Sequence, residues 1–389
     1  MNNFNFYSPT EFIFGRGTQL EAGKTLKRYG AVKVLIVYGS KSAEKSGLIK
    51  QVTDSLDSEQ IGYTILKGIQ PNPTDDRVYE GISAAVSEGV NYILAIGGGS
   101  VIDTAKAIAV GAVYSGDFWD FFTKKATPVA ALPIGTILTI PAAGSEASAS
   151  CVITKKETLS KISIGTNLIR PRFAIMNPEL TMSLPWNQTA YGVTDMLCHI
   201  YERYFSNTPA QLVNAYAEAI MRDIMDQALS LKMDGNDYDA RADIMWAGTI
   251  AHNGLCGVGK EEDWATHRLE HEVSALYDVP HGAGLACMAP AWLEFVAKRN
   301  PDMVWRFAIN VMSVNPTDLT ADEIIAEGIR LLKDFYHDLG LTTSLTELIG
   351  KEPDIDAMVK SLERNMGKTL GSYVVLSMED CREIYKLAL

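Results

Sequence analysis

The sequence predicts two domains: an α/β N-terminal domain with a Rossmann-like parallel sheet, and an all-α C-terminal domain. The chain has 389 residues, which exceeds what one compact core usually holds. Its 47% hydrophobic and 21% charged residues are typical of a globular protein. Short apolar runs alternate with amphipathic stretches only as far as about Pro185. We therefore expect domains over residues 1–183 and 184–389.

The first half predicts strands separated by helices. Apolar runs typical of buried strands lie at 32–38, 63–66, 92–96, 129–132 and 173–176. Helical patterns lie between them at 42–57, 75–89 and 100–112. This alternation is typical of a parallel sheet with helices on its faces.

The second half keeps a helical period throughout. The predicted helices cover 186–205, 208–232, 236–255, 263–276, 282–299 and 321–339. Strand-like runs largely stop, so this half is expected to be a helical domain.

Composition excludes several classes of partner. A net charge of −12 disfavours nucleic acid, because like charges repel. No apolar run reaches the ~20 residues that span a bilayer, and no secretory signal is visible at the N-terminus. The five scattered cysteines are typical of a reducing cytoplasm rather than a disulfide framework. Residues 4–15 precede the first buried strand and resemble an edge strand, which favours a homodimer.

A glycine loop follows the third predicted strand. Gly97, Gly98, Gly99 and Ser100 lead directly into a helix. Glycines let the backbone approach a ligand, and a helix N-terminus offers free amides and a positive dipole end. We predict a pyrophosphate site here, with Ser100 and Asp103 forming a capping box. The alternative is a bare strand-to-helix turn, and the usual G-x-G-x-x-G pattern is absent.

The end of the first buried strand indicates which dinucleotide is bound. An acid at this position usually holds the ribose diol of NAD. Here Gly39, Ser40 and Lys41 follow the strand, and no carboxylate occurs before Glu44. The segment therefore predicts NADP(H), unless Lys41 is simply a solvated residue of the first helical turn.

Five side chains make a candidate metal site. Asp195 and His199 are four residues apart on a predicted helix, as are His267 and His271, so each pair shares a helix face. His281 opens a later helix. Nitrogen and carboxylate ligands without thiolates are typical of zinc or ferrous iron.

The same region contains a competing motif. His267, Glu270 and His271 match H-x-x-E-H, the inverted zinc-protease pattern. In that interpretation both histidines bind zinc and Glu270 is the general base of a hydrolase. The glycine loop and the whole α/β half would then have no role.

With these residues identified, the chain resembles the group III, iron-containing alcohol dehydrogenases, and within them the NADPH-dependent butanol dehydrogenase and aldehyde reductase branch. The resemblance runs from about Phe6 to the C-terminus. Its motifs are PNP at 71–73, GGGSVIDTAK at 97–106, LTIPAAGSE at 138–146 and H-x-x-x-H…H at 267–281. It implies an architecture like that of dehydroquinate synthase.

The resemblance also implies roles for individual residues. The metal ligands would be Asp195, His199, His267 and His281, which leaves His271 to relay a proton. The cofactor would be bound by Gly39, Ser40, Lys41, Asn72, Gly97, Gly98, Gly99, Ser100, Asp103, Thr139, Ser145 and Lys161. Asn72 could instead be a turn residue and Lys161 a solvated one. Ala143 stands where the family commonly has threonine, so one hydroxyl contact to the cofactor is absent.

These expectations combine into one function. A divalent metal, Fe²⁺ or Zn²⁺, polarises a carbonyl while NADP(H) carries the hydride. The expected enzyme is a cytoplasmic NADP-dependent alcohol dehydrogenase or aldehyde reductase acting on small primary alcohols or aldehydes. The alternatives are an NAD-linked, glycerol-type polyol dehydrogenase, dehydroquinate synthase, the zinc hydrolase and a non-catalytic metal-binding protein.

Overall fold

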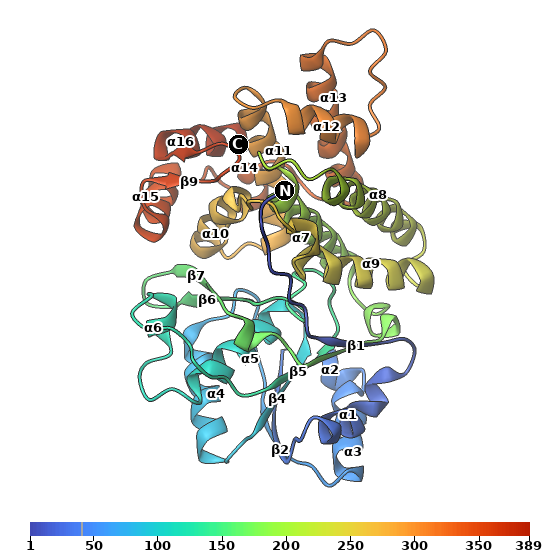
Figure 1. The fold of residues 1–389 in the computed structure, drawn as a ribbon, viewed down its shortest axis with the longest axis vertical. Coiled ribbons are helices and arrows are strands. Elements are labelled where there is room, and N and C mark those ends of the chain that lie inside the picture. The colour runs from blue at the N-terminus through green and yellow to red at the C-terminus, as the bar shows by residue number, and fades with distance from the viewer. Residues whose placement is uncertain (40–41) are drawn as a thin grey trace. The chain divides into compact units, whose positions relative to one another are not determined.

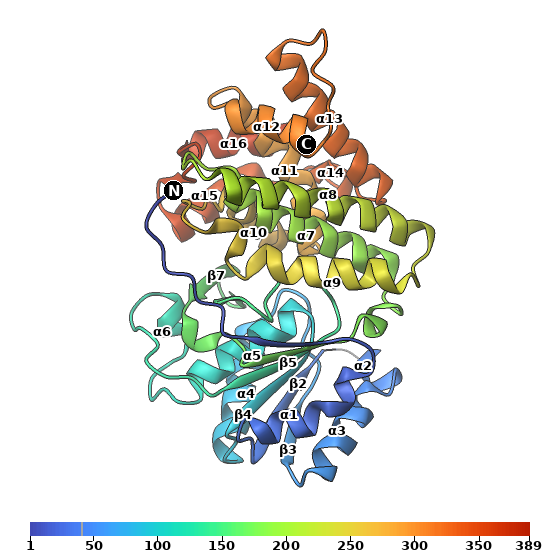
Figure 2. The same ribbon diagram turned by 45° about the vertical axis from the view of Figure 1, so that its right-hand side comes forward.

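The computed structural model describes residues 1–39 and 42–389. It contains two compact units, one over Tyr7–Leu184 and one made of Met1–Phe6 with Pro185–Leu389 (Figures 1 and 2). The first unit holds a parallel sheet with helices on its faces, and the second is almost entirely helical. This is the architecture that the sequence predicts.

The α/β unit is built on a six-stranded parallel sheet in the order β1-β8-β5-β4-β2-β3. The strands are β1 (Glu11–Phe14), β2 (Lys33–Tyr38), β3 (Gly62–Leu66), β4 (Tyr92–Gly97), β5 (Ile134–Leu138) and β8 (Phe173–Met176). Ile36 of β2 pairs with Leu94 of β4 and with Ile65 of β3. The central strands β2, β4 and β5 are buried on both faces, as is usual for parallel sheets.

Helices cover both faces of this sheet, with α1 and α3 on one side and α4 and α5 on the other (Figure 1). Their bounds, with those of the remaining elements, are η1 (Thr18–Glu21), α1 (Ala22–Arg28), α2 (Ser42–Lys45), α3 (Leu48–Ser58), α4 (Asp75–Ser87), α5 (Gly99–Gly111), α6 (Trp119–Phe122), η2 (Asn167–Ile169) and η3 (Pro178–Thr181). An antiparallel hairpin, β6 (Ser150–Lys155) with β7 (Ser160–Gly165), packs on α5. This hairpin brings residues distant in sequence onto the helix that follows the glycine loop.

One predicted strand is wrong. Residues 129–132 form no strand, and Val129 is 89% exposed. The strand begins after Pro133, whose missing amide cannot join a hydrogen-bonded ladder. The apolar run before the proline therefore resembles a strand in composition only.

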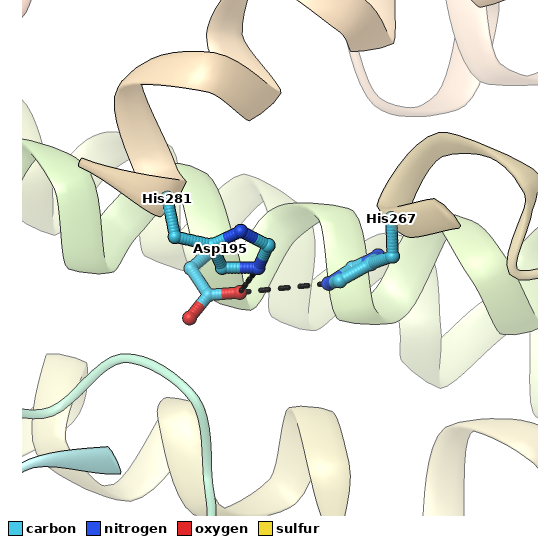
Figure 3. Close-up of side chains that lie close together, drawn as sticks. All are labelled: Asp195, His267 and His281. Atoms are coloured by element: carbon cyan, nitrogen blue, oxygen red, sulfur yellow. Dashed lines mark ion pairs between the residues drawn. The ribbon is translucent and has the colours of Figure 1, made fainter. Parts of the chain in front are cut away.

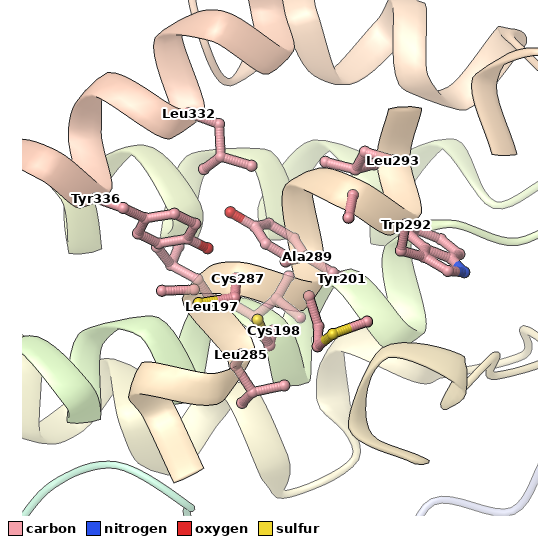
Figure 4. Packing of buried hydrophobic residues seen from close by; sticks show 14 of the residues in the cluster. Leu197, Cys198, Tyr201, Leu285, Cys287, Ala289, Trp292, Leu293, Leu332 and Tyr336 are labelled. Carbon is pink, nitrogen blue, oxygen red and sulfur yellow. The ribbon is translucent and has the colours of Figure 1, made fainter. Parts of the chain in front are cut away.

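The helical unit is organised around α7 (Trp186–Tyr204), which packs against α8 (Gln211–Met233), α9 (Tyr238–His252) and α11 (His281–Ala297). The other elements are η4 (Leu255–Gly257), α10 (Ala265–Tyr277), α12 (Asp302–Asn310), α13 (Ala321–Asp338), α14 (Leu345–Ile349), α15 (Ile355–Met366), α16 (Met378–Leu387) and the short pair β9 (Thr369–Leu370) and β10 (Leu376–Ser377). Leu197, Tyr201, Leu285 and Leu332 are fully or almost fully buried where α7, α11 and α13 meet (Figure 4). The core thus fixes α7 firmly along its length.

The first six residues belong to the helical unit and not to the expected 1–183 domain. The Met1 amino group donates to the Pro209 carbonyl at 2.6 Å, and the Asn2 amide donates to the Gly259 carbonyl at 2.8 Å. These backbone bonds attach the N-terminal segment to the helical unit. In the described part of the chain, no helix has the length and apolarity that crossing a membrane requires.

Candidate metal centre and cofactor loop

Three helices of the helical unit supply the predicted metal ligands. Asp195 and His199 lie one turn apart on α7, His267 lies on α10, and His281 is the first residue of α11. The first three are at most 5% exposed, and His281 is partly buried. Burying a carboxylate among apolar helices is costly unless a cation or several donors offset the charge.

The side chains converge on one carboxylate oxygen. Oδ1 of Asp195 lies 3.3 Å from Nδ1 of His199. The same oxygen lies 3.6 Å from Nε2 of His267 and 3.7 Å from Nε2 of His281 (Figure 3). The last two distances are too long for hydrogen bonds. Among the described residues, Asp195 Oδ1, His199 Nδ1 and His267 Nε2 are buried atoms with no hydrogen-bond partner. The polar atoms therefore face one another without bonding.

This arrangement fits a divalent ion. Metal–ligand bonds of about 2.0–2.2 Å in a tetrahedral site separate the ligand atoms by about 3.3–3.6 Å. The separations from Asp195 are close to that range. Asp195, His267 and His281 each offer an atom within 4.8 Å of the others, whereas His199 lies outside this compact set and reaches Asp195 through Nδ1.

Two buried glutamates orient the imidazoles. Glu202 Oε1 lies 2.7 Å from Nδ1 of His267 and accepts a second bond from the His267 backbone amide at 3.0 Å. Nδ1 of His281 hydrogen-bonds the carboxylate of Glu270. Both glutamates are at most 1% exposed. Because each holds Nδ1, the opposite nitrogen Nε2 is directed toward Asp195.

The same contacts govern protonation of His267. Burial alone would lower its pKa, but the nearby carboxylates of Asp195 and Glu202, the latter hydrogen-bonded to Nδ1, raise the pKa to about 9. Burial, and then the neighbouring rings and Arg203, lower the pKa of His199 well below its ordinary value. A metal ion requires an unprotonated nitrogen, so a proton and an ion compete for Nε2 of His267.

In the α/β unit, the glycine loop lies between β4 and α5. Gly98 is the N-cap of α5, in an extended conformation, and Gly99 is its first residue. A Cβ on Gly98 would lie 2.9 Å from the Cβ of Ile140, and one on Gly99 would lie 2.9 Å from the Cβ of Ala143. These two positions therefore require glycine, since the backbone of the loop lies directly against the segment that follows β5. The N-terminus of a helix offers backbone amides that can bind an anion.

The predicted capping box is wrong. Ser100 already lies inside the helix, and Gly98, which has no side chain to donate or accept, is the N-cap. Asp103 instead accepts a hydrogen bond from Oγ of Ser145 at 2.6 Å and one from the amide of Val152 at 2.9 Å. Its carboxylate fastens the segment after β5 to α5.

Both units of the chain match models of one known protein family. The family model described as "Iron-containing alcohol dehydrogenase" matches residues 9–178, and its C-terminal counterpart, "Fe-containing alcohol dehydrogenase family, C-terminal", matches residues 189–389. The chain belongs to the iron-containing alcohol dehydrogenase family. It is an oxidoreductase of a family that implies iron and a nicotinamide cofactor.

Relatives of this dehydrogenase carry both cofactor names. It is 40% identical to "Probable NADH-dependent butanol dehydrogenase 1" of Bacillus subtilis, over 100% of both chains. It is 34% identical to the "NADPH-dependent aldehyde reductase YqhD" of Escherichia coli, also over 100% of both chains. The crystal structure of NADH-dependent butanol dehydrogenase A from Thermotoga maritima matches with a TM-score of 0.96 and 40% identity, covering 100% of this chain and 99% of that one.

His271 lies beside the candidate metal site of the dehydrogenase. It is 7% exposed, and its ring centroid is 5.6 Å from that of His281. Glu270, His271 and His281 also offer atoms within 4.8 Å of one another. Glu270 is fully buried and bonded to His281, an orienting role that differs from the general base of the hydrolase interpretation. The family match does not favour that interpretation.

The other predicted cofactor residues of the dehydrogenase are found in the α/β unit. The amide of Thr139 donates to the carbonyl of Gly97 at 3.1 Å. Lys161 of β7 donates from Nζ to Oδ1 of Asn72 at 3.1 Å, and Asn72 has a φ of 51°. This pair tethers the hairpin to the loop before α4. Gly39 follows β2, whereas Ser40 and Lys41 lie outside the described residues.

The sequence prediction missed the orienting role of both glutamates. Glu202 lies seven residues after Asp195 on α7 and three after His199, and therefore on the same face of the helix. Extending that face by one turn would have indicated it. Glu270 was assigned only to the hydrolase motif, because its bond to His281 of the next helix has no sequence signature.

Proposed function

We propose that this enzyme is an NADP(H)-dependent alcohol dehydrogenase and aldehyde reductase, butanol dehydrogenase-like, in which Asp195, His199, His267 and His281 hold one divalent ion. The convergence of three ring nitrogens on one oxygen of Asp195 carries the metal assignment. Fe²⁺ is the ion we expect, and Zn²⁺ suits the same ligands.

The reaction converts an aldehyde, NADPH and a proton into a primary alcohol and NADP⁺. When bound, the ion supplies Lewis-acid chemistry at the carbonyl oxygen and the cofactor supplies the hydride. The chain's own residues orient the ligands and limit access of water. Glu202 and Glu270 fix the imidazoles of His267 and His281, and the core around α7 buries Asp195. We assign His271 to proton delivery through its ring nitrogens, since it lies next to His281 without belonging to the proposed ligand set.

In the α/β unit we assign the cofactor to the glycine loop and its surroundings. The backbone amides of Gly98, Gly99 and Ser100 would receive the diphosphate at the N-terminus of α5. The pair Asn72 and Lys161 would line the rest of the cofactor groove, together with the segment from Thr139 to Ser145. Gly97 and Asp103 would hold that segment in place through their hydrogen bonds to Thr139 and Ser145.

The preference for NADP(H) is supported by the end of β2. Gly39, Ser40 and Lys41 provide a hydroxyl and an ammonium where an acid would favour NAD. The nearest acid, Glu44, accepts a hydrogen bond from the hydroxyl of Tyr38 at 2.6 Å and lies 3.4 Å from Nζ of Lys67. Its carboxylate is thus engaged by neighbouring side chains.

A cofactor and substrate screen tests this function. The protein is reconstituted under anaerobic conditions with Fe²⁺ or Zn²⁺, and linear aldehydes of increasing length are reduced with NADPH or NADH. We expect kcat/KM to favour NADPH, and Lys41→Ala to abolish that preference while the control Lys45→Ala retains it. A ratio that favours NADH would overturn the cofactor assignment, and an enzyme that turns over no aldehyde or alcohol would overturn the function.

Two further assignments accompany the proposal. β1 is the terminal strand of the sheet, and Tyr7, which precedes it in the same unit, is 50% exposed. An unpaired sheet edge favours pairing with a second copy, so we assign a homodimer, which sedimentation would reveal as twice the chain mass. All five cysteines are free and buried, which suits the cytoplasm.

A further inference from the structure

Lys106 is a fully buried lysine near the middle of α5. Its Nζ lies within hydrogen-bond distance of Oγ of Ser145 (2.8 Å), the carbonyl (3.0 Å) and Oγ (3.2 Å) of Ser148, and the carbonyl of Ser150 (2.8 Å). An ammonium has three protons to donate, and four oxygens surround it here. The charge is therefore solvated by the protein, as a buried charge must be.

The ammonium belongs to a chain of short contacts. Oγ of Ser145 accepts from Lys106 and donates its single proton to Oδ1 of Asp103 at 2.6 Å. Asp103 also accepts from the amide of Val152 at 2.9 Å. Lys106, Ser145 and Asp103 together form a strut, which we name the α5 strut, between α5 and residues 144–152.

This strut changes the part that two predicted cofactor residues play. The hydroxyl proton of Ser145 is given to Asp103, so it is not available to donate to a cofactor. Asp103 is turned toward Val152 and Ser145. The side chains of Ser145 and Asp103 therefore hold residues 144–152 in place against α5.

The strut also fixes the segment that lies against the glycine loop. The amide of Thr139 bonds to Gly97, and Ile140 and Ala143 lie so close that Gly98 and Gly99 admit no Cβ. Ser145 follows directly in the same segment and is held by Lys106. Moving this segment would move the backbone amides proposed to bind the diphosphate.

We propose that Lys106 is a positioning residue for the nicotinamide cofactor: its ammonium holds Ser145, Ser148 and Ser150 against α5, and so presets the loop that binds the diphosphate. This inference rests on the proposed function, because it requires that a dinucleotide binds at the glycine loop. It gives a chemical reason for a fully buried lysine on α5.

Lys106→Met tests the inference, since it keeps the length of the side chain and removes the charge. Dissociation constants for NADPH and NADH are measured without substrate by fluorescence titration, together with bound metal and the midpoint of thermal unfolding. We expect a Kd raised about ten-fold or more, the loss typical of one charge-assisted hydrogen bond, with metal content unchanged. KM for the cofactor should rise while kcat at saturating cofactor falls far less.

Lys260→Met is the matched control. Lys260 is a partly buried lysine of the helical unit, where Nζ donates to the Tyr204 carbonyl at 2.8 Å and to Oδ1 of Asn214 at 2.6 Å. It should lose thermal stability to a similar degree and bind the cofactor with the Kd of the wild type. A Lys106→Met protein that also binds like the wild type would overturn the inference.

Ser148→Ala removes a single acceptor from Lys106 and keeps the charge, so it serves where Lys106→Met does not fold. A Kd raised about two- to five-fold supports the positioning role, in line with one neutral hydrogen bond, and an unchanged Kd contradicts it. If the wild type binds neither dinucleotide, the proposed function fails and the inference fails with it. If the wild type binds a dinucleotide and both variants bind it with the same affinity, the proposed function stands and the inference alone is lost.

Discussion

The two buried polar clusters of the molecule meet the cost of burial in opposite ways. Around Lys106 in the α/β unit, donors and acceptors lie 2.6–3.2 Å apart and satisfy one another. Around Asp195 in the helical unit, the nitrogens stand 3.3–3.7 Å from the shared oxygen, and several atoms have no partner among the described residues. A polar cluster that is complete by itself can position a backbone, whereas one that is incomplete has room for an ion.

The largest expected effect tests the incomplete cluster. His267→Ala removes a proposed ligand that Glu202 orients. The variant should lose the metal and at least about a thousand-fold of kcat/KM, because the Lewis acid would be lost. His337→Ala, which changes an exposed histidine of α13, is the control and should keep both. Metal content by atomic spectroscopy and kcat/KM with butanal are the measurements. A His267→Ala protein with full metal would exclude His267 as a ligand.

His271 lies close to the proposed metal site, where it could deliver a proton or bind the metal, and His271→Ala distinguishes these two roles. If it delivers a proton, His271→Ala should lower kcat about 10²-fold, within the range of general acid–base catalysis, while bound metal stays near one per chain. Loss of the metal instead would place His271 among the ligands, as its approach to His281 and Glu270 would allow. The pair of measurements, kcat and metal content, decides between the roles.

The orienting glutamates should show a smaller effect. Glu202→Gln keeps the size of the side chain but weakens the bond to Nδ1 of His267, and should lower metal affinity about 10-fold. Glu218→Gln is the matched control, because Glu218 is also buried in the helical unit but bonds Tyr204 and Arg306. Competition with a chromogenic chelator measures the affinity. Equal affinities for the two variants would show that Glu202 does not tune the site.

Sequence periodicity indicated the candidate metal site because two of its residues lie on one helix. Asp195 and His199 share a face of α7, and that face extends to Glu202. Lys106 gave no such signal, since its acceptors lie 39–44 residues further along the chain, in the segment before β6 and at the first residue of that strand. The same distance effect explains the wrong capping box: Asp103 has a local candidate in Ser100, but its partner is Ser145.

Local patterns also fixed most helix positions but not every strand. The six helices predicted for the second half appear close to their predicted ranges, because their apolar residues recur with a helical period. The short apolar run before Pro133 has the composition of a strand, yet the proline moves the strand to β5. Composition alone does not reveal which residues of such a run join the ladder.

The smallest expected effect concerns the complete cluster and its pH dependence. Burial lowers the pKa of Lys106 from its ordinary value of 10.5 to about 8, against the opposing charges of Asp103 and Glu146, while Arg170 lowers the pKa further. The unfolded chain therefore binds more protons than the folded one between these values. Stability must then rise with pH across this window, by on the order of 3 kcal/mol at most.

Lys106→Met removes this titration, while every other group titrates in both proteins. The difference in unfolding free energy between wild type and variant, measured by urea unfolding at the two ends of the window, should therefore shift in favour of the wild type as pH rises. A difference that does not change with pH would mean that Lys106 keeps an ordinary pKa when folded. The four oxygens around it would then fully replace water, and the α5 strut would carry its charge at no cost to the fold.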